Sequence, residues 1–368
     1  MMRRFLILIA FLPACLLAID EPEKTTEPES SPEADNPLKL REMIDTLDQS
    51  SLQEAFRLLT KDYINHEDLD PLAINRAAMQ GLLARLDFGA MLLTEKSLDA
   101  RKSPFRFYSE LVTDNTAYIR FGRFNKPGVD ALDKSLEIYS KNEKIKNLIL
   151  DLRSPQAQAD FAIASEILSR FRPPNELLFK IRRPGQDRPT LFISKLMDHT
   201  WSGKLVLLVD RETGNVGEII AGVLKRHNDC LVIGEKTPGL TVEYRDVPIG
   251  EDRILRYAIA EVVLEDDSSL FQKGITPDIE TPTPLESKRA IFRETQNGKE
   301  LTEFLFQRQR PRMNEAALVA GTDPEIDYYL LRSNNKPTPW DKPPLQDRAL
   351  QQTVDMLRMN QFLSAEEK

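Results

Sequence analysis

One stretch of the chain, residues 205–244, carries the clearest pattern of apolar and polar positions. Residues 205–209 form a continuous apolar run without alternation, which predicts a strand buried on both faces. After a polar turn, apolar residues recur at helical spacing from 216 to 224, and residues 231–233 form a second apolar run. A strand, a helix and a strand in this order predict a right-handed βαβ crossover within a parallel sheet.

The turn before this predicted helix is a favoured place for chemistry, because free backbone N–H groups and the positive end of the helix dipole meet there. Asn215 lies at this point, and Glu218 follows three residues later. Asparagine is a common N-cap, and the two residues together predict a capping box. Because the carboxamide of asparagine is a poor nucleophile, we interpret Asn215 as a helix cap.

The same kind of pattern predicts elements on both sides of this stretch. Ser51 with Glu54 indicates a capping box that opens one helix, and Asp70 followed by Pro71 opens another. Their apolar residues recur at helical spacing. Further helices are predicted at residues 128–140 and 161–171, and strands at 116–121, 147–150, 177–181 and 253–264. This alternation of strands and helices predicts an α/β fold.

The chain resembles the C-terminal processing (tail-specific) serine peptidases. The resemblance is carried by Glu218-Ile219 with the GEKT segment at 234–237, by GITPDI at 274–279, and by AINRAAMQGLLARLDFGAMLL at 73–93. It extends from about residue 51 to residue 282. The resemblance implies an α/β core of the ClpP/crotonase type with a parallel sheet, flanked by N-terminal and C-terminal helical segments.

The resemblance also implies where catalytic residues would lie, and none of the expected residues is present. The position of the family's nucleophilic serine is Asn215, that of its general-base lysine is Leu240, and that of its supporting glutamine is Tyr244. The family's oxyanion loop DLRNNPGG reads DLRSPQAQ here and lacks the glycine pair. We interpret Asp151 and Arg153 in this loop as a structural ion pair or loop anchor.

These substitutions favour a pseudopeptidase that binds or scaffolds other proteins, and we expect Leu240 and Tyr244 to fill the former cleft. One alternative is an active serine-type endopeptidase that uses displaced residues such as Thr213 and Lys236. A lysine base would need burial to lower its pKa from about 10.4. Another alternative is a structural subunit that pairs with an active paralogue.

A PDZ domain usually follows the N-terminal helices of this family and captures the carboxylate of a substrate's C-terminus. Between Leu93 and Phe107 the present chain has only a short charged link. We therefore expect no PDZ domain, and no recognition of protein tails by that route.

The N-terminal residues predict where the protein is located. The sequence opens with MMRRFLILIAFLPACLLA, which predicts a secretory signal peptide cleaved near Ala18 and an exported, periplasmic or extracellular protein. A lipoprotein anchored through Cys15 is the alternative. Only Cys230 would remain after cleavage, so no disulfide framework is expected. No later run is apolar enough to span a bilayer.

Several other classes of function are not indicated. The net charge of −8 without a basic cluster argues against binding to nucleic acid. His66, His199 and His227 lack metal-ligand spacing, and no glycine-rich phosphate motif occurs, so neither a metal nor a cofactor is expected. Trp340, in a proline-rich connector, either fixes a loop to the body or binds a partner. A protein or peptide partner is compatible with these features.

We therefore expect five segments. They are a signal peptide at 1–18, an acidic Pro/Ser-rich disordered tether at 19–37, an N-terminal helical region at 38–100, the α/β core at 101–284 and a C-terminal helical region at 285–368.

Overall fold

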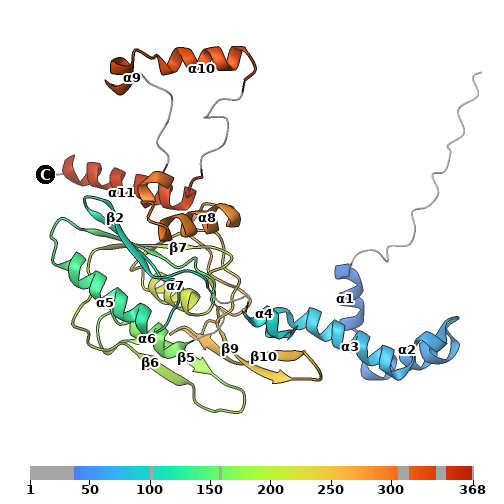
Figure 1. Ribbon diagram of the computed structural model, residues 1–368. Helices are drawn as coiled ribbons and strands as arrows, with labels where there is room; N and C mark the ends of the chain where they lie inside the picture. The colour runs from blue at the N-terminus through green and yellow to red at the C-terminus, as the bar shows by residue number, and fades with distance from the viewer. Residues whose placement is uncertain (1–36, 100–102, 157–159, 306–314, 337–344, 367–368) are drawn as a thin grey trace, which may run out of the picture. The chain divides into compact units, whose positions relative to one another are not determined.

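The computed structural model describes residues 37–99, 103–156, 160–305, 315–336 and 345–366 (Figure 1). The predicted signal peptide with Cys15 and Ala18, nearly all of the tether, and Trp340 lie outside the described residues. The chain divides into two compact units, Met1–Met79 and Gln80–Lys368.

The described part of the first unit is helical. It contains α1 (Pro37–Asp45), α2 (Gln49–Asp62), the short 3₁₀ helix η1 (His66–Asp68) and the beginning of α3 (Pro71–Leu86). The predicted cap at Asp70 is confirmed, because its carboxylate accepts the backbone N–H of Ala73 at 2.6 Å. The predicted capping box at Ser51 is wrong. Asp48 caps α2 instead and accepts the N–H of Ser51 at 2.7 Å, since a carboxylate also complements the helix dipole.

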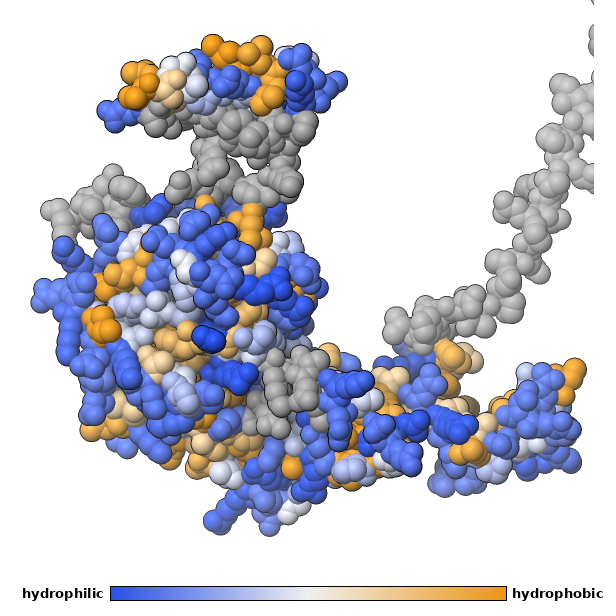
Figure 2. Space-filling view, in the orientation of Figure 1, coloured by the Kyte–Doolittle hydropathy of each residue, from blue (hydrophilic) through white to orange (hydrophobic). Residues whose placement is uncertain are grey.

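The predicted apolar positions of these helices lie on their surface. Phe56 and Leu59 of α2 are 52% and 50% exposed, and Leu82 of α3 is 53% exposed. Within α2 and α3, all of whose residues the structure describes, none is buried. Figure 2 shows separate apolar patches among hydrophilic residues on this helical segment.

A six-stranded sheet forms the centre of the second unit. Four consecutive pairings join five parallel strands, β3, β4, β7, β8 and β11, and β2 joins one edge antiparallel. The predicted βαβ crossover of residues 205–244 is confirmed, with α7 (Val216–Arg226) between β7 and β8. The order is β11 (Ile279–Glu280), β8 (Leu231–Gly234), β7 (Lys204–Val209), β4 (Asn147–Asp151), β3 (Thr116–Arg120), β2 (Tyr108–Thr113).

A second sheet is antiparallel and joins segments that are distant in the sequence. Its order is β1–β10–β5–β6, and β9 also pairs with β10. Two of these strands were predicted, but their assembly into a separate sheet was not. The bounds are β1 (Ala90–Leu93), β5 (Leu177–Arg182), β6 (Thr190–Ile193), β9 (Val242–Pro248) and β10 (Ile254–Val263). Between β1 and β2, where a charged link was expected, lies the short helix α4 (Glu95–Asp99).

Helices cover both faces of the parallel sheet. On one face, α5 (Lys126–Ser140), α6 (Phe161–Leu168) and α7 share a core with inward side chains such as Leu148 and Leu207. On the other face, alternate residues such as Ile149 and Leu208 pack against α8 (Leu285–Gln296), η3 (Leu301–Phe304) and α11 (Arg348–Glu366). Burial on both faces explains why the parallel strands are continuously apolar. Two further helices, α9 (Glu315–Ala320) and α10 (Pro324–Ser333), lie between η3 and α11 in the sequence.

The end of β8 requires a glycine. Gly234 has a φ of +135°, and a Cβ at this position would lie 1.9 Å from the carbonyl oxygen of Val209. Gly234→Ala is therefore expected to lower the free energy of unfolding by about 3 kcal/mol or more. Gly185→Ala is the control, because Gly185 also has a positive φ but has open space around it, and should cost about 1–2 kcal/mol. Equal losses in urea unfolding would contradict the steric explanation.

Candidate functional site

Several of the predicted site residues lie in loops at one edge of the parallel sheet. The loops that follow β4 and β7 leave the same edge, because parallel strands end on the same side. Two hydrogen bonds join these loops to the sheet and to each other. The N–H of Leu152 donates to the carbonyl of Leu208 at 2.9 Å, and the hydroxyl of Thr213 donates to the carbonyl of Leu152 at 3.1 Å.

Asn215 forms a sharp turn directly before α7. Its φ is +48° and its ψ is −113°, a combination that favours glycine. The side chain is buried, makes no cap hydrogen bond to α7, and leaves Oδ1 without a partner among the described residues. The prediction that Asn215 caps α7 through its side chain is therefore wrong. A side-chain N-cap needs a β-region backbone, and the positive φ of Asn215 lies outside it.

Glu218 provides the other half of the predicted capping box. Its buried carboxylate accepts the hydroxyl of Thr237 at 2.6 Å and the N–H groups of Gly239 and Leu240 at 2.5 and 2.6 Å. Burial raises the pKa of Glu218, and these hydrogen bonds oppose the rise. Glu218 thus fixes the segment after β8 against the beginning of α7.

Leu240 lies against the same turn. Its Cδ1 would be 3.3 Å from a Cβ added to Gly214, the residue before Asn215. Tyr244 is held elsewhere. Its hydroxyl donates to the carbonyl of Phe88 at 2.8 Å, and the guanidinium of Arg256 lies 5.5 Å from its ring centroid. Contacts thus link Leu240, but not the Tyr244 hydroxyl, to the turn of Asn215.

Thr213 and Lys236 lie in different surroundings. The fully buried hydroxyl of Thr213 accepts the N–H of Asp210 at 3.0 Å in addition to its bond to Leu152. This hydroxyl therefore holds the loop together. Lys236 is exposed and lacks the burial that a lysine base requires.

Asp151 and Arg153 form the structural ion pair that the sequence predicts, and a third residue extends it. Arg153 contacts the carboxylate of Asp151 at 2.6 Å and that of Asp347 at 2.7 Å, and all three side chains are buried. Burial raises the pKa of Asp151, but the charge and hydrogen bonds of Arg153 lower it below its usual value overall. Asp347 precedes α11 and accepts the N–H of Leu350, so this pair fixes α11 to the sheet edge.

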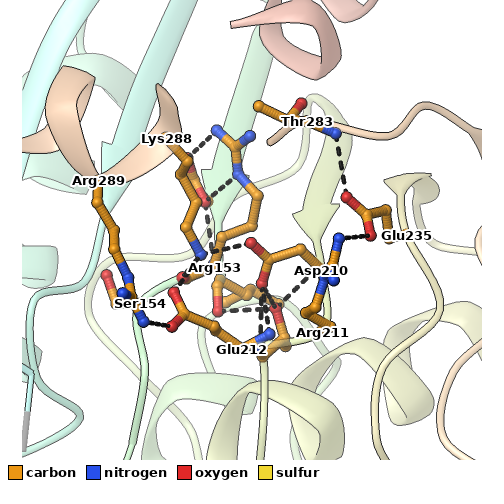
Figure 3. A network of polar contacts seen from close by, with 12 residues as sticks. Arg153, Ser154, Asp210, Arg211, Glu212, Glu235, Thr283, Lys288 and Arg289 are labelled. Atoms are coloured by element: carbon orange, nitrogen blue, oxygen red, sulfur yellow. Dashed lines mark hydrogen bonds and ion pairs between the residues drawn. The ribbon is translucent and has the colours of Figure 1, made fainter. Parts of the chain in front are cut away.

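Lys288 forms the second half of this charged network (Figure 3). Its ammonium group is fully buried, donates to the carbonyl of Arg153 at 2.8 Å, and pairs with Asp210 and with Glu212. Arg289 also pairs with Glu212. Burial raises the pKa of Asp210, and Lys288 offsets part of the rise. No local pattern in the sequence indicates Lys288, because it lies in the C-terminal helical region and its partners Asp210 and Glu212 follow β7.

The remaining candidate groups are a cysteine and possible metal ligands. Burial raises the pKa of the Cys230 thiol to about 12, which suppresses the reactive thiolate. Among the described residues, no group of three or more His, Cys, Asp or Glu side chains is placed to hold a metal ion. In the same part of the chain, no helix is long and apolar enough to cross a membrane.

The charged network should contribute strongly to stability. Lys288→Met leaves the buried carboxylate of Asp210 uncompensated, so we expect a loss of about 3–5 kcal/mol in the free energy of unfolding. The double variant with Asp210→Asn should lose less than the single variant. Lys299→Met, at the exposed pair with Glu294, serves as the control and should change stability little. Urea unfolding in which all three variants lose the same free energy would contradict the network's role.

Substitutions at Asn215 test whether the backbone of this turn is strained. Asn215→Gly and Asn215→Ala both remove the unpartnered carboxamide, but only alanine keeps a Cβ at the positive φ. We therefore expect the glycine variant to be more stable than the alanine variant by about 1–2 kcal/mol. Thermal or urea unfolding measures this difference. Equal stabilities would show that the turn carries no strain.

Comparison with known proteins finds similarity in sequence over part of the chain. Residues 115–281 match peptidase family S41. A carboxy-terminal-processing protease of Bartonella bacilliformis is 28% identical over 60% of this chain and 51% of its own length. The carboxy-terminal processing protease CtpB of Bacillus subtilis is 22% identical over 46% of this chain and 35% of its own length.

A solved structure, the photosystem II D1 C-terminal processing protease, is 20% identical with a TM-score of 0.40 and covers 49% of this chain and 48% of its own. This chain spans about half the length of the carboxy-terminal-processing protease of Bartonella bacilliformis. Residues 115–281, which include the parallel βαβ core, are thus similar in sequence to peptidase family S41 and to carboxy-terminal-processing proteases.

Proposed function

We propose that this chain is a pseudopeptidase, a non-catalytic relative of the C-terminal processing proteases that binds or scaffolds other proteins. The observation that carries the proposal is Asn215. It occupies the strained turn between β7 and α7, where the resemblance puts the nucleophilic serine. Nucleophiles of other hydrolases occupy sharp, strained strand-to-helix turns of this kind. Here the turn is present, but its side chain is a carboxamide and a poor nucleophile.

The position of the general base supports the same conclusion. Leu240 packs against Gly214 beside this turn, and an aliphatic side chain cannot accept a proton. The alternative base, Lys236, is exposed. The alternative nucleophile, Thr213, already uses its hydroxyl to bridge the loops after β4 and β7.

In the part of the oxyanion loop that the structure describes, two backbone donors are already paired, whereas residues 157–158 of the loop lie outside the described residues. The N–H of Leu152 donates to the carbonyl of Leu208, and the N–H of Arg153 donates to Asp151 at 3.0 Å. The buried pairs of Arg153 with Asp151 and Asp347 fix the loop in this arrangement. Donors that stabilise an oxyanion must be unpaired and preorganised toward the reacting atom. These two N–H groups are paired within the protein.

We place partner binding outside the former cleft, which Leu240 and Tyr244 would close. The apolar side chains exposed along α2 and α3 support a binding role, because contiguous apolar surface on soluble proteins commonly marks an interaction site. Export through the predicted signal peptide would put such binding outside the cytoplasm.

The purified chain should not cleave an unfolded protein or peptides with free C-termini. Removal of the nucleophile alone lowers kcat by about 10⁶-fold in a serine peptidase, and the losses within one catalytic unit are not additive. Mass spectrometry of the products after prolonged incubation measures the activity. Cleavage that disappears in Thr213→Ala would refute inactivity and support the displaced-residue alternative.

Restoring the family residues should not restore activity. We expect the triple variant Asn215→Ser, Leu240→Lys, Tyr244→Gln to remain inactive and to be less stable, because it puts a lysine against the turn where Leu240 now packs. Tyr244→Gln alone is the control for the lost hydrogen bond to Phe88. A folded triple variant that cleaves peptides would show that the cleft is open.

A further inference from the structure

A cavity of about 340 Å³ lies between the segment before β2 and the beginning of α5. Its wall contains two cationic side chains and four apolar ones: Arg106, Arg123, Pro104, Phe105, Phe107 and Pro127. The volume is at the small end of the range of about 300–1,000 Å³ that is typical of small-molecule sites. None of these residues belongs to the turn of Asn215 or to the charged network.

The cavity lies at the carboxyl end of β3, the edge where parallel sheets bind their ligands. Gly122, just after β3, allows the two segments to approach, because a Cβ there would lie 2.2 Å from the carbonyl oxygen of Phe105. Gln156, from the loop after β4, donates to the carbonyl of Gly122 at 3.3 Å and accepts the N–H of Phe124 at 3.4 Å. The loops of two adjacent strands thus support the rim of the cavity.

The charge of the cavity is positive and uncompensated within the described residues. Arg106 is exposed and has no hydrogen bond or ion pair with any residue that the structure describes. Arg123 donates through Nε to the carbonyl of Ser103 at 3.1 Å, which orients the guanidinium and leaves both Nη groups without a described partner. Two neighbouring cations without a carboxylate stand out in a chain of net charge −8. A carboxylate accepts paired N–H bonds from a guanidinium with matching geometry.

The helix end contributes charge rather than hydrogen bonds. Asn125 caps α5 by accepting the N–H of Gly128 at 3.1 Å, and Pro127 has no N–H to donate. The positive end of the α5 dipole therefore adds to the potential of the arginines, which must make the direct contacts.

The apolar walls are held rigidly by the core. The ring of Phe105 packs edge-to-face on Phe292 at a centroid distance of 5.2 Å, and that of Phe107 on Phe121 at 5.6 Å. Phe105 is itself buried, so the apolar surface beside the guanidinium groups comes from the half-buried Phe107 and the exposed Pro104 and Pro127. A bare inorganic anion would leave this surface without a partner.

We propose that this cavity binds a carboxylate that adjoins an apolar or aromatic group, either in a small organic acid or in the last residue of a peptide. Arg106 and Arg123 hold the carboxylate, and Phe107 with the two proline rings contacts the apolar group. The proposal does not depend on the absence of catalysis, because binding is measured whether or not the chain cleaves peptides.

Titration calorimetry on the full chain tests the proposal with two matched pairs of probes. The first pair is N-acetyl-phenylalanine and its amide, and the second is a hexapeptide that ends in phenylalanine with a free or an amidated C-terminus. Each acid should bind at least about tenfold more tightly than its amide, because hydrogen bonds to charged groups are worth about 1.5–3 kcal/mol. The tighter acid identifies the source of the carboxylate. Acids and amides of equal affinity, or acids that do not bind, would overturn the proposal.

Variants and a competitor complete the test. Arg106→Gln should weaken binding of the acid about tenfold or more without changing Tm, since Arg106 has no described bond to lose. Arg188→Gln, at an exposed arginine between β5 and β6, should bind as the unchanged chain does. Inorganic phosphate should displace the acid only weakly. Phosphate that competes as well as N-acetyl-phenylalanine, or Arg188→Gln that loses as much affinity as Arg106→Gln, would contradict a specific carboxylate site.

Discussion

The rest of the second unit depends on the buried charges at the carboxyl edge of the parallel sheet. Arg153, between Asp151 and Asp347, fixes the loop after β4 to the beginning of α11. Lys288, between Asp210 and Glu212, fixes α8 to the loop after β7. These contacts hold the helices that cover one face of the sheet. A buried charge without a partner is costly, so the loops cannot move apart without a large loss of free energy.

Carboxylates also accept backbone N–H groups at this edge of the sheet. Glu218 takes up backbone N–H groups of the segment after β8, and Asp151 takes up that of Arg153. In an active hydrolase, donors at such an edge must be free to meet developing negative charge. In this chain the carboxylates of Glu218 and Asp151, which both lie in segments that resemble the family, accept these three N–H groups. The strained turn at Asn215 persists within this framework although its side chain brings no nucleophile.

Local sequence patterns predicted many of the helices and strands, but they did not predict contacts between segments that are distant in the sequence. The βαβ unit followed from apolar runs and helical spacing within one short stretch, and the ion pair of Asp151 from its motif. The contacts of Lys288 and Asp347 join segments far apart in the chain, so no local pattern indicates them. The second sheet was missed for the same reason. Asn215 was misread because residue type indicates a preference for caps, while the turn imposes a positive φ.

Native-state hydrogen exchange of the N–H groups of Arg153, Gly239 and Leu240 tests the central claim, that donors at this edge are committed to the fold. If the network is structural, these groups exchange only through global unfolding, with the same free energy as the core strands. Exchange through local opening at a free energy far below that of global unfolding would contradict it. The edge could then rearrange to receive a substrate.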